Sequence, residues 1–114
     1  MEKENTTAPA QTFDGGVTPE QVEAWKRQHR KVCRIDIVDA GDTHVGFFKR
    51  PDFATIKAVT KLAKSDEVEA GKVMFDNCWL GGSKELREDA VLFMAVQVQL
   101  AKVLNGCMGS LKNL

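Results

Sequence analysis

The sequence predicts a small single-domain α+β protein, with an N-terminal helix, a two-stranded antiparallel β-hairpin and then three α-helices. Two observations lead to this fold class. Apolar and polar residues alternate in two short segments, 31–38 and 43–49, on either side of a turn-forming sequence. After residue 52 the apolar residues recur every three or four positions instead, which is the helical period. The length of 114 residues is enough for one modest core, so a single domain is expected.

The domain is predicted to span residues 18–106, between a disordered N-terminal tail (1–17) and a short C-terminal tail (107–114). The N-terminal segment has few large apolar groups, and it cannot bury enough surface to offset the entropy of ordering it. Thr18 and Gln21 then form a capping box around a proline at the first helical position. A helix is therefore predicted from residue 18 to about residue 29.

The hairpin is expected to follow this helix. Ile35 and Ile37 alternate with polar residues, which indicates a strand with one buried face. Residues 39–42 (DAGD) are a turn signal, and residues 43–49 (THVGFFK) form the second predicted strand. Pro51 ends the hairpin, because proline has no N–H to donate to the ladder.

Three helices are predicted after the hairpin. The first covers residues 52–64, and its expected buried stripe is Phe53, Ile56, Val59, Thr60 and Ala63. The second begins after a possible Ser65 cap, and its stripe is Val68, Gly71, Phe75 and Cys78. Gly81 and Gly82 are interpreted as a helix end, and Ser83 as the cap of the next helix.

The third helix is expected to be the longest and to end at Asn105, before a glycine. Its apolar residues cover more than one face, so it needs cover on two sides. Part of that cover can come from another protein or from this chain's own core. The candidate contact residues are Phe93, Val96, Leu100 and Leu104.

No catalytic, cofactor-binding or metal-binding site is expected, and the protein is predicted not to be an enzyme. Cys78 is the one plausible nucleophile, but it has no recognisable base and falls at a helix C-terminus, where the helix dipole disfavours a thiolate. Core packing explains it better. The three cysteines and two histidines lie far apart, without the paired spacing of a zinc site.

Charge and hydropathy set further limits on partners. The formal net charge is zero, so no overall attraction to nucleic acid or to an anionic membrane is expected. No apolar run reaches the roughly 18 residues that span a bilayer, and the N-terminus does not resemble a signal peptide. A local basic run leaves open a nucleic-acid-binding regulator as the alternative function, although no recognition motif accompanies the run and a solvated surface explains it better. That run consists of Lys26, Arg27, Arg30, Lys31 and Arg34.

Two sequence pieces are more specific than the pattern around them. They are the corner 49–52 (KRPD) and the segment 77–82 (NCWLGG). With these pieces, residues 19–105 resemble the small tail assembly chaperones of long-tailed bacteriophages and prophages. The residues that carry the resemblance are Lys49, Arg50, Pro51, Asn77, Cys78, Trp79, Gly81 and Gly82.

The resemblance implies a non-catalytic protein of the bacterial host cytoplasm. Members of this family are thought to coat the tape measure protein, keep it soluble and help the tail-tube protein assemble around it. They often self-associate, so a homo-oligomer is expected. No cofactor is implied.

Overall fold

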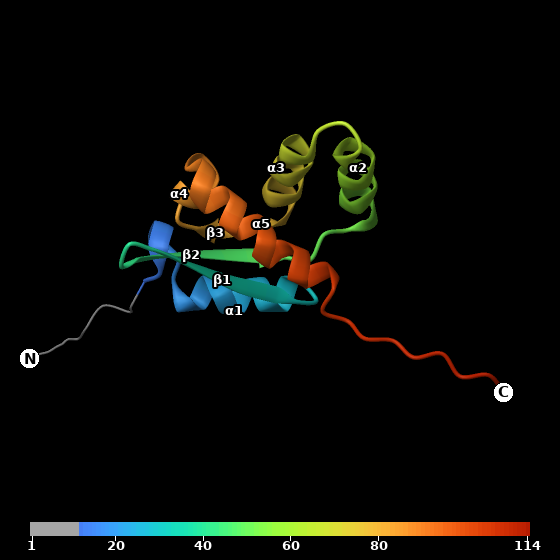
Figure 1. Cartoon of the computed structure of the whole chain (residues 1–114). Coiled ribbons are helices and arrows are strands. Elements are labelled where there is room, and N and C mark those ends of the chain that lie inside the picture. Colours follow the sequence, from blue (N-terminus) through green and yellow to red (C-terminus); the bar gives the residue numbers. More distant parts are fainter. Residues whose placement is uncertain (1–11) are drawn as a thin grey trace, which may run out of the picture.

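A three-stranded antiparallel sheet, in the order β1-β2-β3, lies at the centre of the fold (Figure 1). The structure is a computed structural model that describes residues 12–114, so most of the predicted N-terminal tail, residues 1–11, lies outside the described residues. The elements in chain order are η1 (Asp14–Gly16), α1 (Pro19–Gln28), β1 (Val32–Asp39), β2 (Asp42–Lys49), α2 (Phe53–Ala63), α3 (Glu67–Cys78), β3 (Trp79–Gly82), α4 (Glu85–Glu88) and α5 (Ala90–Leu104). This arrangement confirms a small α+β domain.

The predicted first helix and hairpin are confirmed. Thr18 Oγ1 accepts a hydrogen bond from Gln21 N (3.2 Å), while Gln21 Oε1 accepts one from Thr18 N (3.1 Å), so the capping box is complete. In β1, Ile35 and Ile37 are buried and their polar neighbours are exposed. The turn that joins β1 to β2 contains Gly41, whose positive φ of 89° suits glycine.

The third strand was not predicted. Trp79–Gly82 pairs with β2 in the register Gly46↔Gly82, Phe47↔Gly81 and Phe48↔Trp79. The glycine pair therefore forms a sheet strand, and its interpretation as a corner between two helices was wrong. The physical reason is close approach, because a Cβ atom on Gly81 would lie 2.9 Å from the Trp25 ring.

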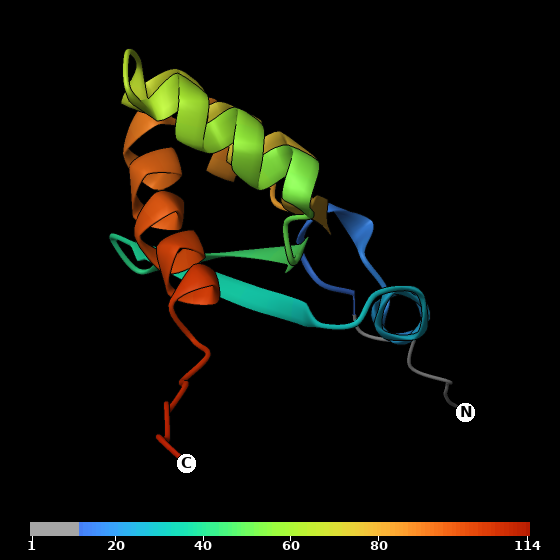
Figure 2. The same ribbon diagram turned by 90° about the vertical axis from the view of Figure 1, so that its right-hand side faces the viewer.

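Placing β2 in the centre buries it on both faces. Val45 and Phe47 pack on one face with Val17, while Phe48 points to the other face and is fully buried among residues of α3 and α5. Different helices cover the two faces of the sheet. Helix α1 lies on the first side, and helices α3, α4 and α5 lie on the second (Figures 1 and 2).

The predicted long C-terminal helix is two helices. The chain leaves the helical conformation at Asp89 (φ −89°, ψ 122°), and this residue caps α5 by accepting hydrogen bonds from Val91 N (2.9 Å) and Leu92 N (3.0 Å). Ser83 was expected to cap the next helix, but its side chain does not cap α4. Its backbone N–H instead donates to Val45 O at 2.8 Å and extends the pairing with β2.

The predicted buried stripe of α2 was also wrong. Phe53 is 91% exposed and Ile56 is 38% exposed, and within α2 only Thr55 is buried. Helix α2 packs on α3 and stands away from the sheet, so its apolar period has little of this chain to cover it (Figure 1).

The chain joins the core before the first predicted helix. Phe13 lies edge-on to Phe47, with 5.2 Å between ring centroids, and Val17 is buried. Asp14 Oδ2 accepts a hydrogen bond from Val45 N at 2.8 Å. Residues 13–17 therefore belong to the domain and not to the predicted tail, because one aromatic ring and one carboxylate anchor them. At the other end, residues 107–114 form no helix or strand and extend from the body (Figure 1).

Candidate protein-binding groove

An open groove with a volume of about 290 Å³ lies between α2, α3 and α5. Figure 2 looks onto the side of the molecule where α2 and the end of α5 are nearest. Nearly all lining residues are apolar or small. They are Val59, Ala63, Glu67, Val68, Ala70, Gly71, Met74, Phe93, Met94, Gln97, Leu100, Ala101 and Leu104.

The groove has a buried floor and an exposed apolar rim. Phe93 and Leu100 belong to the main core and form part of the floor. Val68, Met94 and Leu104 line the groove while keeping about half of their surface exposed. Side chains of this kind usually contact another molecule when they gather around a concave surface.

One polar side chain in the groove lacks a partner. Gln97 Nε2 is buried and makes no hydrogen bond to the described residues. Its amide packs against the helix at Gly71, where an added Cβ would lie 3.0 Å from Gln97 Oε1. A buried donor without an acceptor costs about 1–3 kcal/mol, which weakens the contact between α5 and α3 at this point.

The candidate contact residues from the sequence are placed unequally. Phe93, Leu100 and Leu104 all line the groove, but Phe93 and Leu100 are buried core residues and only Leu104 is half exposed. Val96 has 0% exposure and does not line the groove, so it belongs to this chain's own core. Periodicity alone could not separate the faces of α5, because nearly all of its positions are apolar.

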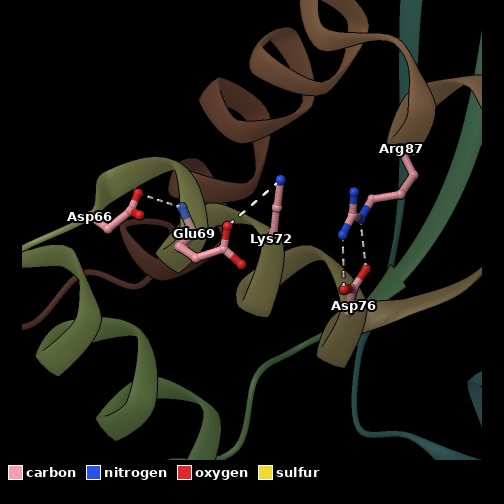
Figure 3. Close-up of polar contacts among 5 residues, drawn as sticks. All are labelled: Asp66, Glu69, Lys72, Asp76 and Arg87. Atoms are coloured by element: carbon pink, nitrogen blue, oxygen red, sulfur yellow. Dashed lines mark hydrogen bonds and ion pairs between the residues drawn. The ribbon is translucent and has the colours of Figure 1, made fainter.

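Three acidic residues at the start of α3 or within it have structural partners (Figure 3). Asp66, and not Ser65 as expected, caps α3 by accepting from Glu69 N at 3.0 Å. Glu69 pairs with Lys72 (3.6 Å), and Asp76 accepts two hydrogen bonds from Arg87 at 2.8 and 3.2 Å. Donating these hydrogen bonds to the Asp76 carboxylate raises the pKa of Arg87. Capping and linkage of α3 to α4 therefore account for these charges.

The two specific sequence pieces meet in space. Trp79 is the strand partner of Phe48, directly before the 49–52 corner that contains Lys49, Arg50 and Pro51. Trp79 also stacks on Phe75, with 5.1 Å between ring centroids. Asn77 Nδ2 donates to Val73 O at 2.8 Å within α3. Trp79 therefore joins the end of the sheet to α3, while the Asn77 contact lies within that helix, so both contacts are structural.

Cys78 is buried, which confirms its interpretation as a core residue. Its Sγ lies 4.0 Å from Met74 Sδ, and burial raises the pKa of the Cys78 thiol to about 11. The neutral thiol is therefore strongly favoured near neutral pH.

Thiol alkylation should distinguish the exposed Cys107 from the buried Cys78. In the native protein at pH 8, iodoacetamide is expected to modify the exposed Cys107 at least tenfold faster than Cys78. Peptide mass spectrometry over a time course measures each site separately. In urea the rates should become similar, and a Cys78 that reacts as fast as Cys107 in the native protein would contradict the buried placement.

The predicted basic run is divided and partly paired. Lys26 contacts Glu23 at 3.1 Å on α1, and Arg34 donates to Asp36 at 2.8 Å on β1. These acids lower the local positive charge. Two of the five cations therefore have an acidic neighbour, and the nucleic-acid alternative stays a hypothesis.

A polar cluster around His44 was not predicted from the sequence. His44 Nδ1 lies 3.2 Å from Ser83 Oγ and 3.8 Å from Glu85 Oε1. Both partners approach the same ring nitrogen, so the acid cannot orient the ring from the other nitrogen as in a hydrolase triad. Within the described residues, no group of three or more His, Cys, Asp or Glu side chains could hold a metal ion. No helix among these residues is long and apolar enough to cross a bilayer.

Comparisons with known proteins bear on the fold. No protein-family model matches the chain, and no curated protein matches it. The solved structure of the uncharacterised protein rbstp2171 from Bacillus stearothermophilus is similar, with a TM-score of 0.58 and 20% sequence identity over 81% of this chain and 99% of the other. At this identity the likeness shows a shared fold alone.

Proposed function

We propose that this protein is a non-catalytic tail assembly chaperone of a phage or prophage, acting in the bacterial host cytoplasm. It would bind the tape measure protein and help the tail-tube protein assemble around it. The observation that carries this proposal is the apolar groove between α2, α3 and α5, taken together with the sequence resemblance.

The shape and chemistry of the groove suit one face of a helix. Apolar side chains from three helices line an open trough, which is the usual receptor for an amphipathic helix that inserts residues at i, i+3 and i+4 spacing. Helix α2 enlarges the surface, because Phe53 and Ile56 are exposed on it. A long helical client presents such faces repeatedly, so many copies could bind along it.

A charge placed on the groove rim should abolish client binding. Met94→Glu combined with Leu104→Glu puts two carboxylates beside the floor without touching a fully buried residue. We expect at least a tenfold loss in the amount of tape measure protein, from the same gene cluster, that co-purifies and stays soluble on co-expression.

The matched control is Val91→Glu combined with Val98→Glu. Both residues are exposed on α5, but neither lines the groove, so this variant carries the same added charge elsewhere. It should retain client binding. Equal losses in both variants would reject the groove as the binding site, and a wild-type protein that captures no tape measure protein would reject the function.

A further inference from the structure

The outer edge of β1 is an unpaired sheet edge within the described residues. The strand order is β1-β2-β3, so β1 has a neighbour on one side only, and no other backbone hydrogen bond among residues 12–114 reaches it. The strand is eight residues long. Figure 2 shows it at the lower border of the sheet, between the end of α5 on one side and α1 on the other. Free N–H and C=O groups on such an edge can pair with another strand.

The residue order along β1 is self-complementary. We propose that two copies of this protein pair their β1 strands antiparallel about Ile35, which gives a continuous sheet of six strands, three from each copy. In this register Arg34 of each copy lies opposite Asp36 of the other. Cys33 then lies opposite Ile37, and Val32 lies opposite Val38. Just outside the strand, Lys31 comes opposite Asp39.

Neighbouring registers lack this match. A two-fold axis perpendicular to the sheet keeps each residue on its own face, so the axis must pass beside one residue and its copy. Centred on Arg34, the pairing sets two arginines opposite each other. Centred on Asp36, it sets two aspartates opposite each other. Like charges directly opposite are destabilising, so the register about Ile35 is selected by charge.

The charged pair is placed to take part. Arg34 and Asp36 lie opposite Phe47 and Val45 in β2, so both point to the α1 side of the sheet, where each side chain is nearly half exposed. Within one chain Arg34 already donates to Asp36 at 2.8 and 3.2 Å. In the dimer each guanidinium gains a second carboxylate, which forms a ring of four alternating charges.

The sign pattern also argues against a purely protective edge. Edges that avoid pairing usually carry charges of one sign or a proline, which repel or block a second copy. Here the signs alternate, and the formal net charge of zero removes long-range repulsion between copies. On the other face, Ile35 and Ile37 extend the apolar layer under α5 toward the dimer axis.

Charge reversal tests this interface in the purified protein without any client, so its outcome is independent of the proposed function. Arg34→Asp alone makes both positions acidic, and Asp36→Arg alone makes both basic. By sedimentation velocity, over concentrations up to about 0.5 mM because a small interface gives a weak dimer, each single variant should dimerise at least tenfold more weakly than wild type.

Two further samples separate the interface from a folding defect. The double variant R34D/D36R again places opposite charges across the axis, so it should regain the dimer. An equimolar mixture of R34D and D36R should form a heterodimer more readily than either variant forms a homodimer. No loss of folding could produce either result.

Lys26→Glu is the matched control for R34D, because it lowers the net charge by the same amount on α1, where Lys26 pairs with Glu23. It should leave dimerisation unchanged. The proposal is overturned if the wild type stays monomeric across the range, or if R34D dimerises as well as wild type. A dimer lost only when residues 107–114 are removed would also overturn it, since that would place the contact elsewhere.

Discussion

Gly82→Ala is expected to destabilise the fold by about 3 kcal/mol or more, which would detach β3 from β2. Gly82 has φ of +135°, which side-chain-bearing residues rarely adopt. A Cβ atom there would collide with the carbonyl oxygen of Val45 and would lie 2.8 Å from Gly46 Cα. Both neighbours belong to the central strand, so neither can move without breaking its pairing. Urea unfolding followed by circular dichroism measures the change.

Gly41→Ala separates backbone strain from the collision. Gly41 also has a positive φ (+89°), but nothing lies within 4 Å of an added Cβ. Its substitution should cost only about 1 kcal/mol, the conformational preference of glycine. If the two variants lost the same stability, the collision of an added Cβ at position 82 with β2 would contribute nothing to the loss.

Phe48→Ala is expected to cost about 3–5 kcal/mol, because it leaves a cavity where the sheet meets α3. Phe48 has 0% exposure, and its ring centroid lies 5.2 Å from that of Phe75 and 5.3 Å from that of Trp79. Edge-to-face contacts of this kind add to the loss of buried area. The free energy of unfolding, from chemical denaturation, measures the effect.

Phe53→Ala is the matched control at the other extreme of burial. Phe53 is 91% exposed on α2, so removing its ring should change the stability of the isolated protein by less than about 0.5 kcal/mol. The identical substitution is therefore expected to be strongly destabilising at Phe48 and nearly neutral at Phe53. A large loss for Phe53→Ala would mean that its ring is covered, for example by another copy.

Several elements were predictable because their signals are local. The capping box of Thr18 and Gln21 sets the start of α1 within one turn. The alternation around Ile35 and Ile37 and the turn before β2 specify a hairpin from adjacent residues. The start of α2 depends on Asp52, whose carboxylate accepts from Thr55 N at 2.8 Å, and that hydrogen bond lowers the pKa of Asp52.

The groove was only partly predictable. Phe93, Leu100 and Leu104 were singled out on α5 as contact residues, but Val68 and Met94 were not. Val68 was predicted to lie in a buried stripe of α3, and that was wrong, because it is 51% exposed at the groove rim. Gln97 was also missed, although it is a polar residue in an apolar helix. Which side of α5 faces the groove depends on where α2 and α3 pack, and that information is absent from the period of α5 itself.

The α+β class, the first helix, the hairpin and the burial of Cys78 follow from local patterns, because caps, turns and short periods act between residues that are close in the chain. The strand at 79–82, the largely uncovered surface of α2 and, within residues 12–114, the free edge of β1 become visible only in the folded molecule. Each of these depends on contacts between distant residues. For Gly81 and Gly82, the deciding fact is that the backbone of β2 approaches too closely for any side chain at Gly82, which no local pattern can express.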